Sequence, residues 1–468
     1  MGQGQGQGQG QQGRSPSSAP VPAFLPSPSL QFDAEFESGN LERAVRVLGR
    51  ESLVPLIFQS LTDTQAQSQT HTQFPLYTPV PTPHTGSAPV PAPYLAPAPT
   101  PAPALAPQPV HQEYDLTLRT DLQTDGNVQW YYFKVTLPIT YPLRVRFNIV
   151  NMQKKDSLYN YGMKPACFSV HAQGQGKGQG EDWRHRGEDV CYYRNTRPQS
   201  DKKRRRLYTL TFTYTFWSAD VVYFAHSFPY TYSDLQSHLR TLDHSFLHSR
   251  VLTRTICGNA CDLLTISERS GGMTESRNKP AIFLSARVHP GESNSSYIMH
   301  GFLDFITSDL PQALKLRRSF VFHIIPMLNP DGVIHGNYRC SLAGTDLNRR
   351  YVHPHPRLHP TIFAKKNLIR AATQSRGVLL YLDLHGHSKL KNSFCYGCDP
   401  PPQGLGQWGQ AGEAQALVSQ DNCREHGSFS YRDCAFRVEA SKGGTGRVVC
   451  WRELGIPASY TIEASFCG

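Results

Sequence analysis

Apolar and polar residues alternate along the chain between about Tyr114 and Phe228. Such alternation, in segments rich in Val, Thr, Tyr and Phe, is typical of half-buried β-strands. Polar turns, such as TDGN at residues 124–127, separate the segments. Several short strands at this spacing predict an antiparallel β-sandwich. The predicted strands are YDLTLRTDL, VQWYYFKVTL, LRVRFNIV, LYTLTFTYTF and VVYFAHSF.

The pattern changes from about Lys279 onward. Apolar segments (AIFLSARV, FVFHIIPML, VLLYLDLHG) alternate there with segments of helical spacing (NSSYIMHGFLDFITS, PTIFAKKNLIRAATQ). This alternation predicts an α/β domain whose sheet is covered by helices. The segment TYSDLQSHLRTLDHS, with a predicted N-cap at Ser233, reads as a helix that leads from the sandwich into this second domain.

Two segments have a composition that cannot bury enough apolar surface to fold. Residues 1–29 are rich in Gly, Gln, Pro and Ser, and residues 64–111 are rich in Pro and Ala. We therefore predict a disordered segment at 1–29, a sandwich domain at 30–230 with a disordered insertion at 64–111, and an α/β domain at 231–468.

The charge of the chain favours acidic partners. It has 47 Lys and Arg against 36 Asp and Glu, a net charge of +11. The basic run 202–206 fits a nuclear address or a nucleic-acid patch, but a solvated hairpin tip is the better interpretation of so short a run. The 11 Cys have no framework spacing, and we expect neither a secretory signal nor a membrane span. Together these features predict a reducing, intracellular setting.

Chemically unusual residues follow three predicted strands. His289 and Glu292 flank a Pro-Gly turn, an NPDG segment follows the next strand, and His385 and His387 end the third. Two His and one Glu from different strands could bind Zn²⁺ and leave a coordination position for water. Asp383, two residues before His385, could orient one of these ligands without binding the metal itself. A lone HxxE pattern is weak in a chain with 19 His, whereas three such strand ends in one domain are hard to explain by packing.

Four segments closely resemble cytosolic carboxypeptidases, intracellular members of the carboxypeptidase A superfamily. They are ARVHPGESNSS, PMLNPDGVIHGNYRCSLAGTDLNRR, DLHGHSKLKNSFCYGC and GTGRVVCWRELGIPASYTIEASFCG. The resemblance covers about residues 30–60 and 112–468, and RLHPTIFAKKNL leans toward the Nna-type founding subgroup. It implies an antiparallel β-sandwich followed by a carboxypeptidase-like α/β domain, with a mixed central sheet flanked by helices.

The resemblance also implies roles for individual residues. Glu463, in YTIEASF, would be the general base that takes a proton from zinc-bound water. Arg339 would polarise the scissile carbonyl and stabilise the oxyanion. The implied ligands of a single zinc ion are His289, Glu292 and His385.

The same resemblance implies how substrate is bound. Asn348 and Arg349 would hold the terminal carboxylate of the substrate, for which arginine offers a fixed fork of donors. Family members prefer C-terminal glutamate and shorten polyglutamate branches on proteins such as tubulin. Arg447 is our candidate for reading the glutamate side chain, with Arg452 and Lys389 as weaker candidates. The implied partners are tubulin or other proteins with acidic tails, in the cytosol, with the nucleus as an alternative, whereas nucleic acid is not favoured.

Two departures from the family pattern stand out. The stretch RVEASKGGTGRVV lacks the tyrosine that secreted relatives place over the substrate, and Tyr431 lies too early to be assigned that role. The chain ends at Gly468, where family members usually continue into a final helix, so we expect a fragment or an incomplete chain. The CYGC at 395–398 is interpreted as buried structure, because a lone CxxC is a weak metal or redox signal.

Two other functions stay open at this point. The same fold and zinc site could hydrolyse small acyl-amino acids. Alternatively, the chain could be a non-catalytic module that binds microtubules or nucleic acid. The intact set of predicted ligands and base disfavours the inert module, and the attached sandwich favours a protein tail as substrate.

Overall fold

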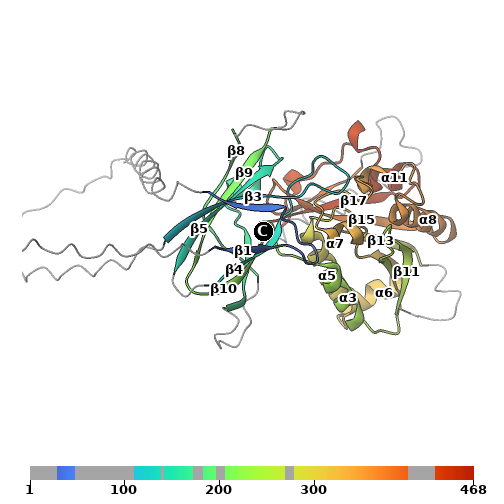
Figure 1. Cartoon of the computed structure of the whole chain (residues 1–468). Helices are drawn as coiled ribbons and strands as arrows, with labels where there is room; N and C mark the ends of the chain where they lie inside the picture. The colour runs from blue at the N-terminus through green and yellow to red at the C-terminus, as the bar shows by residue number, and fades with distance from the viewer. Residues whose placement is uncertain are drawn as a thin grey trace, which may run out of the picture.

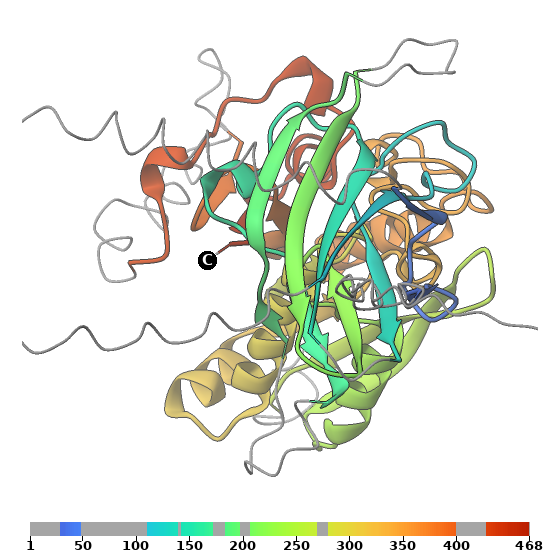
Figure 2. The same ribbon diagram turned by 60° about the vertical axis from the view of Figure 1, so that its left-hand side comes forward.

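The computed structural model describes residues 29–47, 110–138, 142–171, 183–196, 206–268, 279–398 and 427–467. Two domains lie side by side (Figure 1), and the second view shows the strands of the first domain in front of the second (Figure 2). The predicted disordered segments and most of the basic run fall outside the described residues. Strand β3 begins at Val110, so the last two residues of the predicted insertion at 64–111 belong to a strand.

Two five-stranded sheets form the first domain. The order in one is β1-β4-β10-β6-β7: Gln31–Asp33, Tyr132–Leu137, Asp220–Ala225, Ala166–Ser169 and Arg184–His185. The order in the other is β2-β3-β5-β9-β8: Arg43–Arg46, Val110–Thr117, Leu143–Met152, Tyr208–Phe216 and Glu188–Arg194. A fully buried cluster of Phe133, Phe147, Phe212 and Phe224 fills the space between the sheets, with ring centroids 5.3–6.3 Å apart. The alternation in the sequence marks this inward face, which confirms the predicted sandwich.

The sandwich departs from the prediction in two details. Strands β3 and β5 pair in parallel. Strand β4, which lies between them in the sequence, belongs to the opposite sheet. The chain therefore crosses to that sheet and back, so that β5 runs in the same direction as β3. The strands predicted from the sequence do not include β7 or β8. Both are largely exposed edge strands, and their polar composition does not distinguish them from a loop.

A seven-stranded mixed sheet forms the second domain, in the order β11-β12-β14-β13-β15-β17-β16. Its strands are Leu247–Arg254, Ala260–Ile266, Val321–Ile325, Ala281–Ala286, Val378–His387, Ala458–Ser465 and Ser393–Tyr396. The four strands β14, β13, β15 and β17 run parallel. Their carboxyl ends therefore meet at one edge, where sites are expected in an α/β fold.

Helices cover both faces of this sheet (Figure 1), as predicted. Alternate residues of β13 explain this arrangement. Ile282 and Leu284 pack with α5 on one face, and Ala281 and Phe283 pack with α8 on the other. The helices are α3 (Tyr232–Thr241), α5 (Ser293–Thr307), α6 (Pro311–Ser319), α7 (Pro330–His335), α8 (Pro360–Ser375) and α11 (Gly446–Arg452). Within the described chain, no helix combines the length and apolar character needed to cross a bilayer.

The helix α3 begins two residues earlier than predicted. Its N-cap is Thr231, whose hydroxyl accepts from the backbone N–H of Asp234, while the Asp234 carboxylate accepts from the N–H of Thr231. This reciprocal capping box satisfies two otherwise unpaired donors. Ser233 lies inside the helix instead.

The two domains are joined by an extensive polar and apolar contact. Phe466, just after β17, packs into the core cluster of the sandwich. Asn40 of the sandwich donates to the carbonyl of Gly336, at the end of α7. Gly336 has φ +80°, and a side chain there would lie 2.3 Å from the carbonyl oxygen of Gly39. The close approach therefore requires glycine.

Candidate active site

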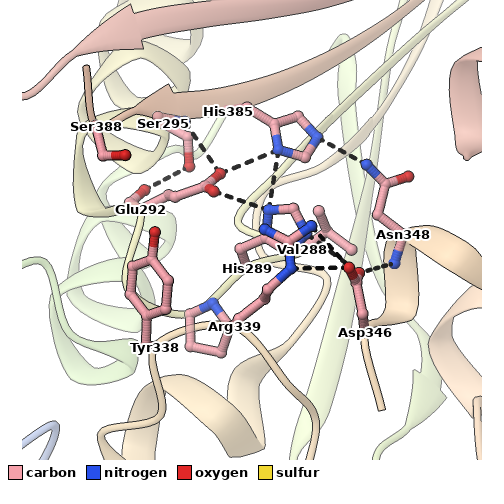
Figure 3. Close-up of polar contacts among 12 residues, drawn as sticks. Val288, His289, Glu292, Ser295, Tyr338, Arg339, Asp346, Asn348, His385 and Ser388 are labelled. Atoms are coloured by element: carbon pink, nitrogen blue, oxygen red, sulfur yellow. Dashed lines mark hydrogen bonds and ion pairs between the residues drawn. The ribbon is translucent and has the colours of Figure 1, made fainter. Parts of the chain in front are cut away.

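The corner from His289 to Glu292, the chain that follows β14 and the end of β15 converge at the carboxyl ends of β13, β14 and β15. They line a cavity of about 360 Å³, a volume within reach of small-ligand sites. In Figure 3, His289, Glu292 and His385 point toward one another, with Arg339 and Asp346 beside His289. The chain thus brings together groups that are far apart in the sequence.

The corner after β13 is held by a buried arginine. Arg287 has φ +56°, a conformation that costs energy for a residue with a side chain. Its guanidinium donates to the carbonyls of Pro290 (2.7 Å) and Tyr230 (2.9 Å) and to the Ser296 hydroxyl (2.9 Å). Gly291 completes the corner, because a Cβ there would lie 2.6 Å from the ring of Tyr338. These contacts turn His289 and Glu292 toward the same point.

The predicted ligands form a buried triad. Glu292 Oε1 lies 2.8 Å from His289 Nδ1, and its Oε2 lies 3.0 Å from His385 Nδ1. The two Nδ1 atoms are only 3.2 Å apart. Two protonated rings would repel one another at this distance, whereas a shared cation would suit them. The donor set, two imidazoles and one carboxylate, fits Zn²⁺.

The charge state of Glu292 suits the same role. Burial alone would raise its pKa, but the charges and hydrogen bonds of His289 and His385 outweigh burial and hold the pKa well below its usual value. The carboxylate is therefore ionised and available as a ligand near neutral pH.

Each histidine of the triad has a carboxylate other than Glu292 beside its Nε2 atom. Asp383 Oδ2 lies 3.2 Å from His385 Nε2, and Asp346 Oδ1 lies 3.3 Å from His289 Nε2. Such partners fix the ring orientation and leave the other nitrogen free to bind metal. Asp383 occupies the position predicted for it. The role of Asp346 was not predicted, although it stands in the TDLNRR segment singled out for its neighbours.

Glu463 lies beside the triad. It is the direct neighbour of His385 across β15 and β17, and it lines the cavity. Burial and the charge of Glu292 raise its pKa to about 7, although His385, His289 and Arg339 counteract this shift. A carboxylate with such a pKa can accept a proton and release it again near neutral pH.

Arg339 lines the cavity from the loop after α7. Its Nε and Nη2 donate to Asp346 Oδ2 at 2.8 and 2.7 Å, which fixes the guanidinium. The backbone beneath it is held from the other domain: Asp121 accepts from the N–H groups of Tyr338, Arg339 and Cys340 at 2.6–2.8 Å. The sandwich therefore positions part of the site.

Asn348 and Arg349 both line the cavity. The side-chain oxygen Oδ1 of Asn348 accepts from Gly446 N–H (3.0 Å), and its Nδ2 lies 3.4 Å from His385 Nε2. Asn348 is thus buried and fixed between two elements. The half-buried Arg349 lines the cavity, and its Nη1 donates to the backbone carbonyl of Asn348 (2.9 Å).

Arg447, in the first turn of α11, is buried at the cavity wall, where its Nη1 contacts the Gly397 carbonyl and lies 3.4 Å from Cys398 Sγ. Arg452 and Lys389 are exposed and lie outside the described lining. Lining residues that sequence reasoning missed include Lys154 of the sandwich, Tyr338, Tyr396, Arg437 and Lys442.

The structure also places the CYGC cysteines and Tyr431. Cys395 and Cys398 are buried, as predicted, and Cys395 Sγ lies 3.6 Å from Cys434 Sγ. Tyr431 is exposed and does not line the cavity.

Comparison with known proteins agrees with this geometry. The sequence profile of the zinc carboxypeptidase family matches residues 232–468. Cytosolic carboxypeptidase 2 of Mus musculus is 46% identical over 365 residues, covering 76% of this chain and 40% of that protein. Cytosolic carboxypeptidase 3 of Bos taurus is 45% identical over 365 residues, covering 76% and 35%. The chain thus spans less than half the length of these relatives.

Solved structures share the fold. A metallo-carboxypeptidase from Burkholderia cenocepacia matches 94% of this chain and 90% of its own, with a TM-score of 0.61 and 19% identity. A metallo-carboxypeptidase from Pseudomonas aeruginosa matches 93% and 90%, with a TM-score of 0.60 and 17% identity. Both matches extend over the two domains, so the sandwich and the α/β domain form a recurring pair.

Proposed function

Because this chain belongs to the zinc carboxypeptidase family, we propose that it removes C-terminal glutamate from proteins and shortens acidic or polyglutamate tails. The observation that carries the proposal is the composition of the cavity around the His289, Glu292 and His385 triad. Among its described lining residues are six basic and three acidic side chains: Lys154, Arg339, Arg349, Arg437, Lys442 and Arg447, against Glu292, Glu439 and Glu463. Such an excess of positive charge favours an acidic substrate.

The residues divide the work of peptide hydrolysis. Zinc, when bound, is a Lewis acid that activates water and polarises the carbonyl. Glu463 accepts the proton of the attacking water and later passes it to the leaving amine. Arg339 donates to the oxygen on which negative charge develops, and its pairing with Asp346 fixes it in advance.

Binding of the chain end rests on other residues. Arg349, with Asn348 beside it, holds the terminal carboxylate, which selects a free C-terminus over an internal peptide bond. Arg447 binds the side-chain carboxylate of the terminal glutamate. The net charge of +11 suits acidic tails such as those of tubulin. The names of the relatives favour the cytosol as the place of action.

The test is release of free glutamate from synthetic peptides that end in several glutamates, and from glutamylated tubulin tails followed by mass spectrometry. We expect loss of terminal glutamates with the wild-type chain, and a loss about 100-fold slower or more with the Glu463→Gln variant, at equal zinc content.

Two outcomes would redirect the assignment. Zinc bound without glutamate release, in wild type and variant alike, would support a binding module. Cleavage of small acyl-amino acids but not of peptides would support an amidohydrolase on the same site.

A further inference from the structure

Two cysteines lie in contact beside the active-site cavity. Cys395 is the third residue of β16, and Cys434 follows the short 3₁₀ helix Tyr431–Asp433. Their sulfur atoms are 3.6 Å apart, although the residues are 39 positions apart in the sequence. Each cysteine precedes a residue that lines the cavity, Tyr396 and Ala435 respectively. The chemistry of the pair is therefore connected to the cavity wall through the backbone.

Backbone hydrogen bonds hold the two segments together at this point. The N–H of Ala435 donates to the carbonyl of Cys395 (3.1 Å), and the N–H of Gly397 donates to the carbonyl of Ala435 (3.0 Å). Tyr396 and Ala435 form a parallel bridge, so Cys395 and Cys434, one residue earlier on each side, also stand opposite each other. Strands paired in this way are ~4.7–4.9 Å apart, and a disulfide needs Cα atoms roughly 4.4–6.8 Å apart. The backbone is therefore already spaced for a disulfide.

The two thiols differ in their access to solvent. Cys395 is fully buried, whereas Cys434 is partly exposed. A small reagent that arrives from solvent therefore meets the sulfur of Cys434 first. Cys395 is in place to react with Cys434 in a second step.

Cys434 is also the better nucleophile of a pair arranged in this way. Its sulfur accepts hydrogen bonds from the Cys395 thiol at 3.6 Å and from the Cys395 N–H at 3.3 Å. These hydrogen bonds, the one from the thiol above all, lower the pKa of Cys434 to about 7, although burial counteracts them. About half of this thiol is ionised at pH 7, against about 3% of an ordinary cysteine with a pKa of ~8.5.

We propose that Cys434 and Cys395 form a site of reversible oxidation, at which a hydroperoxide converts the two thiols into a disulfide. The Cys434 sulfur attacks one peroxide oxygen and the O–O bond breaks. The other oxygen leaves as an alcohol, or as water from hydrogen peroxide, and Cys434 becomes a sulfenic acid. The Cys395 sulfur then attacks the Cys434 sulfur, and the S–O bond breaks. Hydroxide leaves and takes the Cys395 proton, which gives water. Two thiols have lost two electrons to one peroxide.

The disulfide would join two segments that form part of the cavity wall. Tyr396 and Ala435 would then be next to covalently linked residues, and the Gly397 carbonyl, which Arg447 contacts, lies two residues after Cys395. A disulfide bond is ~2.05 Å long, so the two sulfur atoms would approach each other by about 1.5 Å. Among cellular reductants such a bond forms transiently and reports the supply of oxidant.

Disulfide mapping tests the proposal without reference to peptidase activity. The zinc-loaded chain is treated with a small excess of hydrogen peroxide, the remaining thiols are alkylated, and the digest is analysed by mass spectrometry. We expect a peptide pair linked through Cys395 and Cys434, which dithiothreitol separates. The matched control is Cys191→Ser, which removes an exposed thiol on β8 and should leave the Cys395–Cys434 link unchanged.

Two variants test the order of the steps. Cys395→Ser removes the second thiol, so the sulfenic acid should accumulate on Cys434, where dimedone traps it at a rate about tenfold above that at Cys191. Cys434→Ser should leave the buried Cys395 unmodified at the same peroxide dose. Near-ultraviolet circular dichroism verifies that both variants are folded, and the mapping of the wild type does not depend on either.

The alternative is that the two sulfurs are only in packing contact. Absence of the Cys395–Cys434 link in the peroxide-treated wild type would show this. A link from Cys434 to Cys423, which lies outside the described residues, would also overturn the proposal. Equal dimedone labelling of Cys434 and Cys191 in Cys395→Ser would show that Cys434 is not the reactive thiol.

Discussion

His385 on β15 and Glu463 on β17 are direct partners across two parallel strands. Partners in adjacent strands project to the same face, about 5 Å apart. The register of the sheet therefore sets the distance between a proposed metal ligand and the proposed base, which are 78 positions apart in the sequence.

Shortening the base by one methylene tests this register. Glu463→Asp keeps the charge but withdraws the carboxylate from the water it must deprotonate, and a misplacement of ~1 Å can cost about 100-fold in rate. Glu463→Gln removes the base entirely and should cost about 100- to 10,000-fold. Steady-state rates on a glutamate-ending peptide, with zinc content measured in parallel, check the order of the two. Equal rates for Glu463→Asp and wild type would contradict the assigned role.

Asp346 bonds both His289 and Arg339. Burial alone would raise the pKa of Asp346, but the hydrogen bond and charge of His289, followed by the charge of Arg339, hold the pKa well below its usual range, so the group is an anion. Asp346→Asn keeps the shape but removes the charge. We expect zinc affinity to fall about 10–100-fold and kcat to fall even with zinc in excess, because Arg339 is no longer fixed. A change in zinc affinity alone would show that Asp346 does not position Arg339.

Asp121 tests whether the sandwich supports catalysis. It accepts three backbone N–H groups beneath Arg339 from the neighbouring domain. An asparagine offers a single acceptor oxygen, so Asp121→Asn should leave buried donors unpaired, at about 1–3 kcal/mol each. We expect a lower free energy of unfolding and at least a tenfold lower kcat, with bound zinc unchanged. Glu188→Gln, on an exposed part of β8, serves as the control. Unchanged kcat in Asp121→Asn would limit the sandwich to stability.

The strands and the metal corner were predictable because local pattern encodes them. Alternation marks the inward face of the sandwich, and continuous apolar runs mark β13, β14 and β15, which are covered on both sides. Pro290 and Gly291 mark a turn at a strand end, which made His289 and Glu292 visible as a pair.

The supporting residues were not predictable, because their neighbours in space are distant in sequence. Asp121 lies 217 residues before its first partner, Tyr338, and nothing in its own segment marks it. Lys154 reaches the cavity only because the two domains pack together. Asp346 lies in the TDLNRR segment, in which the sequence analysis assigned roles to Asn348 and Arg349 only. It lies 57 positions after His289, so the sequence did not reveal their contact.

The specificity of the pocket can be tested with a matched pair of arginines. Arg447 is buried at the cavity wall, whereas Arg452, on the same helix, is exposed over the Trp451 ring. Arg447→Gln should lower kcat/KM for C-terminal glutamate by about 10–100-fold, as expected for the loss of one charged hydrogen bond, and should affect C-terminal leucine less. Arg452→Gln should leave both unchanged. An unaltered preference for glutamate in Arg447→Gln would move the specificity role to another basic residue of the cavity.

A buried histidine between the domains should make the fold sensitive to acid. His226 packs against Tyr131, Tyr159 and Phe466. Burial, and then the charges of Lys154 and His185, lower its pKa from 6.5 to about 3. The imidazole of His226 is therefore protonated below about pH 6.5 in the unfolded chain, but only below about pH 3 in the folded chain. Stability from this group is complete above pH 6.5 and declines as the pH falls, by up to ~1.4 kcal/mol per pH unit.

Replacement of the histidine should remove that part of the slope. We expect His226→Gln to be less stable than wild type at pH 7.5, with the two unfolding free energies converging as the pH falls toward 4. His323, whose pKa burial lowers to about 4, remains in both proteins and contributes equally to each curve. His248→Gln, at an exposed position, should run parallel to the wild type throughout. Urea unfolding at a series of pH values measures the slopes, and parallel curves for His226→Gln and wild type would show that this interface does not sense acid.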